Sequence, residues 1–200
     1  MPIEHEHRYL LKPNSVANIF DGKDYTLEGV YNVEQFYIAN DPTRKMCERI
    51  RSKSMVGSNF STQYTRTTKI GSAPKSNEHE DEISEASFLQ LREYFTIGRV
   101  IKKFRYVIFV DGLCWEIDAM DIDDETFMFA ELENPPSEYK LPFGNTFNIT
   151  GIHQYSNVSI ALNSEMPLNW GAVKYAGKLL LSKGDTINTE SVDKEAEAVN

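Results

Sequence analysis

The sequence predicts a mainly β fold with a few helices (α+β), built as an antiparallel barrel with a charged interior. Two observations predict it. Short segments of strand-like composition follow one another up to about residue 163, separated by turn residues. In several of them charged residues alternate with apolar ones, so one face of the sheet is ionic and the other apolar. An outward apolar face suggests a barrel around a hydrated, ligand-holding interior, with helices and loops packed outside it.

The first such strand runs from Ile3 to Leu11, where Glu4, Glu6 and Arg8 occupy every second position and share one face. The same alternation recurs in five later segments: Arg49-Ile50-Arg51, Glu80-Asp81-Glu82, Lys103-Phe104-Arg105, Glu116-Ile117-Asp118 and Glu131-Leu132-Glu133. One such pair alone is more often a solvated surface than a site. Six strands together indicate a shared ionic surface.

Turn chemistry and helical spacing identify the other elements. Asp111-Gly112 predicts a hairpin between Val107–Val110 and Leu113–Asp118, because this pair suits the turn that matches strand twist. Ser84 to Tyr94 predicts a short helix over the sheet, because Ser84 can cap it and apolar residues recur at helical spacing. The remaining helical candidates are Ser15 to Phe20 and Ser156 to Leu162.

Length and composition predict how the chain is divided. With 200 residues, 40% of them hydrophobic and 26% charged, the chain is long and apolar enough to fold around a core. We expect a barrel domain over residues 1–163 and an extension over 164–181 that packs on the barrel. The polar, acidic residues 182–200 are expected to form a disordered tail.

Charge and cysteine content limit the classes of function. A formal net charge of -9 argues against broad electrostatic binding to nucleic acid or to an anionic membrane. The charged start and the lack of a long apolar run predict neither a signal peptide nor a membrane span, and therefore a cytoplasmic location. Cys47 and Cys114 are too few for a disulfide framework, which fits a reducing compartment.

The charges also divide between segments, and this division predicts the chemistry. Basic residues gather on three strands, as Arg49, Arg51, Lys69, Lys103 and Arg105. From Tyr106 to Tyr139 there is no Lys or Arg, whereas ten residues are acidic. Crowded carboxylates repel one another and are relieved by a hard divalent cation, here Mg²⁺ or Mn²⁺. Basic strands that face an acidic, metal-holding wall are suited to binding a triphosphate.

Taken in order, these motifs resemble the CYTH, or triphosphate tunnel metalloenzyme, superfamily. The hallmarks of that family are an N-terminal Glu-x-Glu-x-Lys strand and an eight-stranded antiparallel β-tunnel, and here the strand carries Arg8 in the Lys position. Further matches follow in family order: Glu48-Arg49-Ile50-Arg51, Thr67-Thr68-Lys69-Ile70-Gly71, the acidic strand from Glu78 to Ile83, Lys103-Phe104-Arg105-Tyr106, Trp115-Glu116-Ile117-Asp118, Ala130-Glu131-Leu132-Glu133, and Ile149 to Asn157. The resemblance covers roughly residues 2 to 163.

The resemblance implies roles for the charged residues. The expected triphosphate-binding residues are Arg49, Arg51, Lys69, Lys103 and Arg105, and the expected catalytic residues are Glu4, Glu6 and Arg8. The carboxylates expected to bind Mg²⁺ or Mn²⁺ are Glu4, Glu6, Glu80, Glu82, Glu116, Asp118, Glu131 and Glu133. Glu78 shares the parity of Glu80 and Glu82, so the register of that strand is open. Arg stays charged, whereas Lys titrates more readily. Arg8 in place of Lys therefore puts a role as proton donor in doubt but does not affect phosphate binding.

The implied activity is metal-dependent hydrolysis of an inorganic, nucleoside, thiamine or RNA 5′-triphosphate. One alternative is a class IV-type adenylate cyclase, since such cyclases share the tunnel. The other is a non-catalytic module that binds a nucleotide or polyphosphate, because one fold hosts many functions. The expected partner is a triphosphate-bearing small molecule or RNA 5′ end, bound by a monomer or homodimer.

Overall fold

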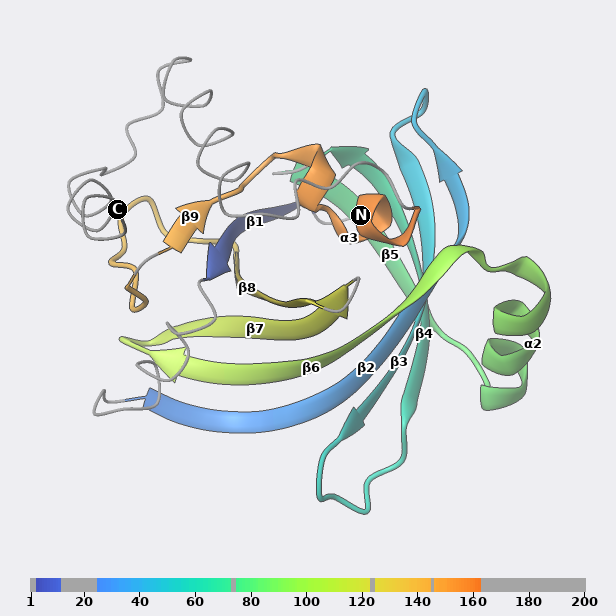
Figure 1. Ribbon diagram of the computed structural model, residues 1–200, viewed down its shortest axis with the longest axis horizontal. Coiled ribbons are helices and arrows are strands. Elements are labelled where there is room, and N and C mark those ends of the chain that lie inside the picture. The colour runs from blue at the N-terminus through green and yellow to red at the C-terminus, as the bar shows by residue number, and fades with distance from the viewer. Residues whose placement is uncertain (1–2, 12–24, 73–74, 123–124, 145, 163–200) are drawn as a thin grey trace.

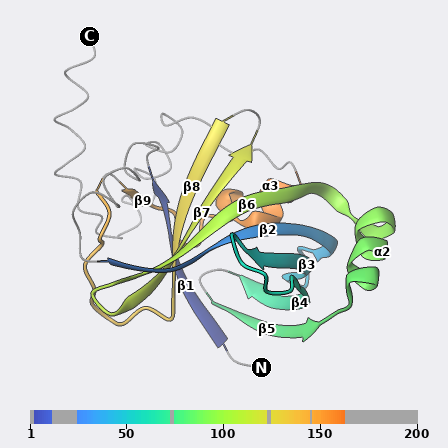
Figure 2. The ribbon, with the colours of Figure 1, turned by 90° about the horizontal axis from the view of Figure 1, so that it is seen from below.

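The described residues form a closed barrel of eight antiparallel strands, which confirms the predicted fold class. Figure 1 and Figure 2 show how the strands are arranged. The computed structural model describes residues 3–11, 25–72, 75–122, 125–144 and 146–162. In chain order the barrel strands are β1 (Ile3–Leu11), β2 (Tyr25–Asp41), β3 (Met46–Met55), β4 (Gln63–Ser72), β5 (Lys75–Glu82), β6 (Ile97–Val110), β7 (Leu113–Ile122) and β8 (Glu125–Glu133). Around the barrel they follow the order β5-β4-β3-β2-β6-β7-β8-β1.

Strand β1 closes the barrel by pairing differently along its length. Its first residues, Ile3 to His5, pair with β5, and the rest, Glu6 to Leu11, pair with β8. A short strand, β9 (Thr146–Asn148), pairs with the last three residues of β1 on the side that β5 leaves free. In the barrel, β1 therefore lies between β5 and β8, two strands that both carry acidic residues.

The predicted hairpin joins β6 and β7. Its turn residues Asp111 and Gly112 both have positive φ angles, 50° and 76°, which is the backbone that a tight two-residue hairpin turn requires. The strands on either side pair in register, with Val110 opposite Leu113 and Arg105 opposite Asp118. The hairpin prediction is confirmed, and its register brings a cation and a carboxylate face to face inside the barrel.

Two of the predicted helices are confirmed. Helix α2 (Glu85–Phe95) begins after Ser84, whose side chain accepts a hydrogen bond from the Ser87 amide. Its only buried residue, Phe88, packs on Phe36 and Ile50 on the outside of the barrel. The 3₁₀ turn η1 (His153–Tyr155) leads into helix α3 (Asn157–Ala161), which Ser156 caps in the same way. The predicted helix from Ser15 to Phe20, the extension 164–181 and the tail 182–200 lie outside the described residues.

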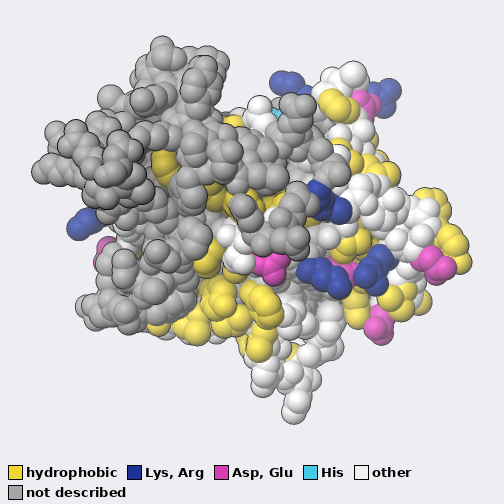
Figure 3. All heavy atoms as spheres, in the orientation of Figure 1, with side chains coloured by type: hydrophobic (Ala, Val, Ile, Leu, Met, Phe, Trp, Pro, Cys, Tyr) yellow, Lys and Arg dark blue, Asp and Glu magenta, His cyan; other side chains and the backbone are white. Residues whose placement is uncertain are grey.

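The apolar core lies mainly outside the strands, as the alternation predicts. Trp115, Ile117 and Leu132 are buried together in one cluster between the barrel and the segment around Phe143. Part of the outer surface stays apolar and exposed, because Phe104 retains half of its accessible surface. On the face seen in Figure 3, hydrophobic side chains stand beside groups of Lys and Arg.

Within the ranges that the structure describes, no helix is long and apolar enough to cross a membrane.

Candidate functional site

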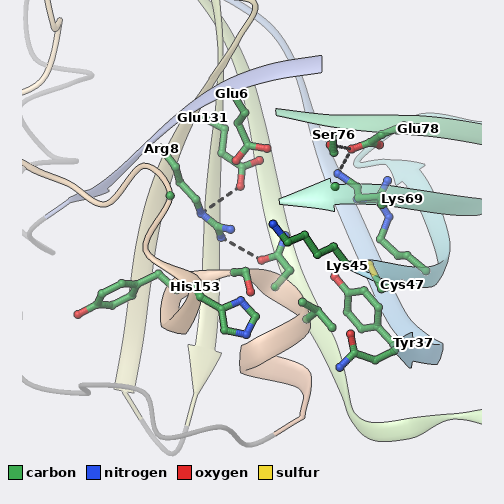
Figure 4. Close-up of a pocket in the computed structure, with 18 of the residues that line it drawn as sticks. Glu6, Arg8, Tyr37, Lys45, Cys47, Lys69, Ser76, Glu78, Glu131 and His153 are labelled. Carbon is green, nitrogen blue, oxygen red and sulfur yellow. Dashed lines mark hydrogen bonds and ion pairs between the residues drawn. The ribbon is translucent and has the colours of Figure 1, made fainter. Parts of the chain in front are cut away.

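A cavity of about 940 Å³ lies inside the barrel and brings together most of the predicted site residues (Figure 4). The predicted residues that line it are Glu6, Arg8, Arg49, Arg51, Lys69, Glu80, Arg105, Glu116, Glu131 and Glu133. They come from seven strands, which project them inward because each charged residue alternates with an outward one. The segment from Ile149 to Val158 lines the cavity as well.

Arg8 is held in place by three contacts. Its Nε lies 3.2 Å from Glu131 Oε1, and its Nη2 donates to Asn157 Oδ1 at 2.9 Å. The guanidinium also lies over the Phe129 ring, with Cζ 4.6 Å from the ring centroid. The planar guanidinium, with several N–H donors, can make these three contacts at once, whereas the single ammonium of Lys could not. The departure from the family motif at this position is therefore accommodated by packing and hydrogen bonding.

A cation, a hydroxyl and a carboxylate form a row across β3, β4 and β5. Arg49 Nη2 donates to Thr67 Oγ1 at 3.2 Å, and Thr67 Oγ1 donates to Glu80 Oε2 at 2.7 Å. Arg51 joins the row from the next inward position of β3, since its Nη2 lies 3.1 Å from Glu80 Oε2. Glu80 thus orients both arginines, so that the two cations face the cavity together.

Lys69 and Glu78 form a second ion pair between β4 and β5, next to the first row. Figure 4 shows them across the cavity from Arg8 and Glu131. Glu78 and Glu80 both line the main cavity, whereas Glu82 does not. The register, which the sequence left open, brings Glu78 opposite Lys69 and Glu80 opposite Thr67.

Lys103 and Asp118 lie beneath the wall of the cavity and do not line it. Lys103 pairs with Asp118, and both side chains are almost completely buried. Burial alone would raise the pKa of Asp118, but Arg105 and Lys103 hold it well below its ordinary value. Burial, reinforced by the Arg105 cation, lowers the pKa of Lys103 to about 8. Lys103, predicted to bind phosphate, therefore pairs with Asp118 in the wall of the barrel and does not line the cavity.

Arg105 reaches the cavity but directs its donors at carboxylates. Its Nε and Nη2 bind Asp118, Nη2 also lies 3.0 Å from Glu131 Oε2, and Nη1 pairs with Glu116. Although burial opposes ionisation, Arg8 followed by Arg105 keeps the pKa of Glu131 below its usual range. Arg105 therefore positions three of the predicted metal ligands, Glu116, Asp118 and Glu131.

Two other carboxylates have raised pKa values. Burial, with repulsion from Glu131, raises the pKa of Glu6 to about 7. Burial raises the pKa of Glu133 as well, and repulsion from Glu116 and Glu131 adds to the effect. These carboxylates share one electrostatic environment, and the acidic side chains that line the cavity outnumber its Lys and Arg side chains. Hard oxygen donors that repel one another fit the chemistry of a divalent cation site.

The remaining predicted metal ligands are less closely placed. Glu4 lies on the part of β1 that pairs with β5, opposite Ser76. Glu82 lines a separate, smaller cavity. Among the described residues, no three His, Cys, Asp or Glu side chains form a ready-made metal-binding group.

Two contributors to the site were missed at the level of sequence. Thr67 shares the parity of Lys69 on β4, so the alternation that identified Lys69 also pointed to it. Asn157 contacts Arg8 across 149 positions of the chain, and no local pattern signals such a contact.

The chain is similar to known proteins in sequence and in fold. No protein-family model matches the chain. The chain is 30% identical over 98 residues to the inorganic triphosphatase of Acetivibrio thermocellus, a match that covers 48% of this chain and 62% of that protein. The crystal structure of the hypothetical protein NE1496 aligns with a TM-score of 0.50 and 24% identity over 80% of this chain and 97% of that chain. The PH1819 protein from Pyrococcus horikoshii OT3 aligns with a TM-score of 0.49 and 17% identity, over 92% of this chain and 91% of that one. The triphosphatase match and the closed barrel confirm the resemblance identified in the sequence.

Proposed function

We propose that this chain, which resembles the CYTH or triphosphate tunnel metalloenzyme superfamily in its strand motifs and its barrel, hydrolyses a triphosphate-bearing substrate with a divalent cation. The observation that carries the proposal is the cluster of inward cations in one cavity: Arg8, Arg49, Arg51 and Lys69. Such cations bind phosphate oxygens through charge-assisted hydrogen bonds.

An unsatisfied donor in the cavity wall supports an anionic substrate. The Nε atom of Arg49 is buried and donates no hydrogen bond within the described residues, whereas the buried Nε of Arg8 has its ion pair with Glu131. A buried donor without an acceptor costs about 1–3 kcal/mol, so a ligand that supplies acceptor oxygens is favoured there. A phosphate chain supplies such oxygens in series, which suits guanidinium groups on two facing walls.

The carboxylates on the acidic wall support the cation. Glu116, Glu131 and Glu133 would hold Mg²⁺ or Mn²⁺, because they are hard oxygen donors whose mutual repulsion a cation would relieve. When bound, the cation would neutralise charge on the phosphate oxygens during transfer. Arg105 fixes two of these carboxylates in advance, so little reorganisation is needed on binding.

We assign the role of the base to Glu6, which lines the cavity. Its pKa of about 7 allows it to accept a proton at neutral pH. The oxygen of water forms a bond to the terminal phosphorus while the bridging P–O bond breaks. The leaving diphosphate part of the substrate keeps the electron pair of that bond, the attacked phosphorus departs as orthophosphate, and the proton of water passes to Glu6. Arg49, Arg51 and Lys69 hold the phosphate oxygens during this step and stabilise the charge on them.

A substrate panel tests the proposal. Release of phosphate and pyrophosphate would be measured from tripolyphosphate, ATP, thiamine triphosphate and a 5′-triphosphorylated RNA, each with Mg²⁺ or Mn²⁺. The proposal expects metal-dependent phosphate release from at least one of them. Pyrophosphate together with cyclic AMP from ATP would instead identify a cyclase. Tight binding of a triphosphate without any product would identify a binding module.

A further inference from the structure

A second, smaller cavity of about 320 Å³ lies at the far side of Arg51. Its lining consists of Arg51, Lys53, Gln63, Thr65, Glu80 and Glu82. Arg51 and Glu80 also line the main cavity, so the two cavities share a wall. The cavity is polar and adjoins the proposed site, yet the proposed reaction uses neither Lys53 nor Thr65.

The strand register repeats one arrangement of side chains in both cavities. At the main cavity, which Arg49 and Glu80 line, Arg49, Thr67 and Glu80 lie side by side on three neighbouring strands. Two residues further along, Arg51, Thr65 and Glu82 occupy the equivalent positions. The first row is joined by hydrogen bonds through the Thr67 hydroxyl.

The second row is not joined in this way, because Arg51 reaches toward Glu80 instead. Thr65 is 9% exposed, and its Oγ1 is a buried atom without a hydrogen-bond partner within the described ranges. The row therefore presents a buried hydroxyl and a guanidinium to the second cavity, and both can donate to an incoming acceptor.

Lys53 adds a second cation to this cavity. Its Nζ lies 4.2 Å from the centroid of the Tyr31 ring, and it forms no ion pair with a carboxylate among the residues that the structure describes. Burial lowers the pKa of Lys53, because it disfavours the charged ammonium. A nearby anion would stabilise the ammonium and offset this effect. Two cations and a hydroxyl thus converge without a carboxylate bound to Lys53 or to Thr65.

The acidic residues of this cavity are differently placed. Glu80 is already paired with Arg51, and Glu82 is exposed, so its charge is screened by water. Thr65 is buried and Lys53 only partly exposed, and interactions with them are screened less. The hydroxyl of Thr65 and the ammonium of Lys53 therefore favour the binding of a small oxyanion such as phosphate in this cavity.

We propose that Arg51, Lys53 and Thr65 form a second phosphate-binding subsite beyond the main cavity. The inference rests on the proposed function, because it takes the main cavity as the site of the reacting triphosphate. Two sources share the required chemistry. One is the distal phosphate of a linear polyphosphate longer than tripolyphosphate, and the other is the free orthophosphate that hydrolysis releases.

Kinetics and calorimetry on matched variants test the subsite. Lys53→Met and Thr65→Val remove the donors, Lys53→Arg and Thr65→Ser keep them, and Lys102→Met removes an exposed lysine of β6 as a control. For each protein we would measure KM for tripolyphosphate, KM for a longer linear polyphosphate, and inhibition by orthophosphate. Calorimetric titration with orthophosphate, and separately with the longer polyphosphate, provides readouts that need no turnover.

We expect Lys53→Met and Thr65→Val to leave KM for tripolyphosphate unchanged. Each should weaken binding of either the longer chain or orthophosphate by about tenfold, as loss of a charge-assisted hydrogen bond predicts. Weakening of the longer chain identifies the distal phosphate as the ligand, and weakening of orthophosphate identifies the product. Equal values in all five variants and the parent would overturn the subsite. If the parent hydrolyses nothing, the proposed function fails, and the calorimetric titration decides the subsite on its own.

Discussion

Arg105 donates from Nε and Nη2 to the two carboxylate oxygens of Asp118, each at 2.7 Å. The two residues face each other on β6 and β7, and Asp118 has no exposed surface. Lys103 joins them, so a carboxylate lies between two cations in the barrel wall. Asp118 and Lys103 thereby fix the position of the Arg105 guanidinium, which also donates to Glu116 and Glu131 at the cavity.

Substitution of Asp118 tests the importance of this group for folding. Asp118→Asn would leave Lys103 and Arg105 buried without their carboxylate, and we expect a loss of about 3–5 kcal/mol in the free energy of unfolding. Urea denaturation measures it. Asp121→Asn is the control on the same strand, because Asp121 is exposed and accepts only from Thr126. Similar losses in both variants would contradict a special role for the buried group.

The two inward threonines of β4 should respond in opposite ways to the same substitution. Thr67→Val removes the hydroxyl that links Arg49 to Glu80, and we expect it to destabilise the fold by about 1–3 kcal/mol. Thr65→Val removes a buried hydroxyl without a partner in the described structure, and it should be neutral or stabilising. Thermal denaturation of both variants measures the difference. A larger loss at Thr65 than at Thr67 would be inconsistent with these contacts.

Glu6 should make stability depend on pH. Its pKa is near 4.5 in the unfolded chain and about 7 in the folded protein, so the folded state holds an extra proton between these values. Its contribution to stability is therefore present at low pH and is lost as the pH rises from about 4.5 to about 7. Glu6→Gln cannot ionise and should remove this loss, which is about 2 kcal/mol after allowance for partial exposure.

Urea denaturation of the metal-free parent and of Glu6→Gln across this pH range measures the effect. The two stability curves should diverge as the pH increases, with the variant becoming the more stable protein. Curves that stay parallel would show that Glu6 does not titrate in this range.

Replacement of Arg8 by Lys, the residue of the family motif, should destabilise the protein. Arg8→Lys keeps the charge but cannot contact Glu131, Asn157 and the Phe129 ring together, so we expect a loss of about 1–2 kcal/mol in stability. Asn157→Ala removes one of these contacts and should cost about 1 kcal/mol. Chemical denaturation compares the two. An Arg8→Lys variant as stable as the parent would mean that these contacts do not select arginine.

Local alternation carried most of the information about the fold. The period of two in Glu6 and Arg8, and again in Arg49 and Arg51, identified residues that line the cavity. This works because a strand has no other way to place alternate side chains. The Asp111-Gly112 pair likewise identified one hairpin from backbone geometry alone.

Pairing between distant residues could not be predicted. The sequence separated cations from carboxylates by segment, but only the register shows that Arg105 binds Asp118 and that Lys69 binds Glu78. A shift of two residues along β5 preserves parity, so Glu78, Glu80 and Glu82 could not be distinguished. Asn157 approaches Arg8 because the segment after β9 folds back over the barrel, and that approach has no local signal.

Release of phosphate from tripolyphosphate is the measurement that tests the central claim most directly. It would compare the parent with the double variant Arg49→Ala, Arg51→Ala and with the surface control Lys102→Met, each with Mg²⁺ or Mn²⁺. The account predicts metal-dependent release by the parent and the control, and a fall of about 100-fold or more in the double variant, since two phosphate-binding cations are lost. Absence of release from the parent with either metal, or release by the double variant at the parental rate, would contradict it.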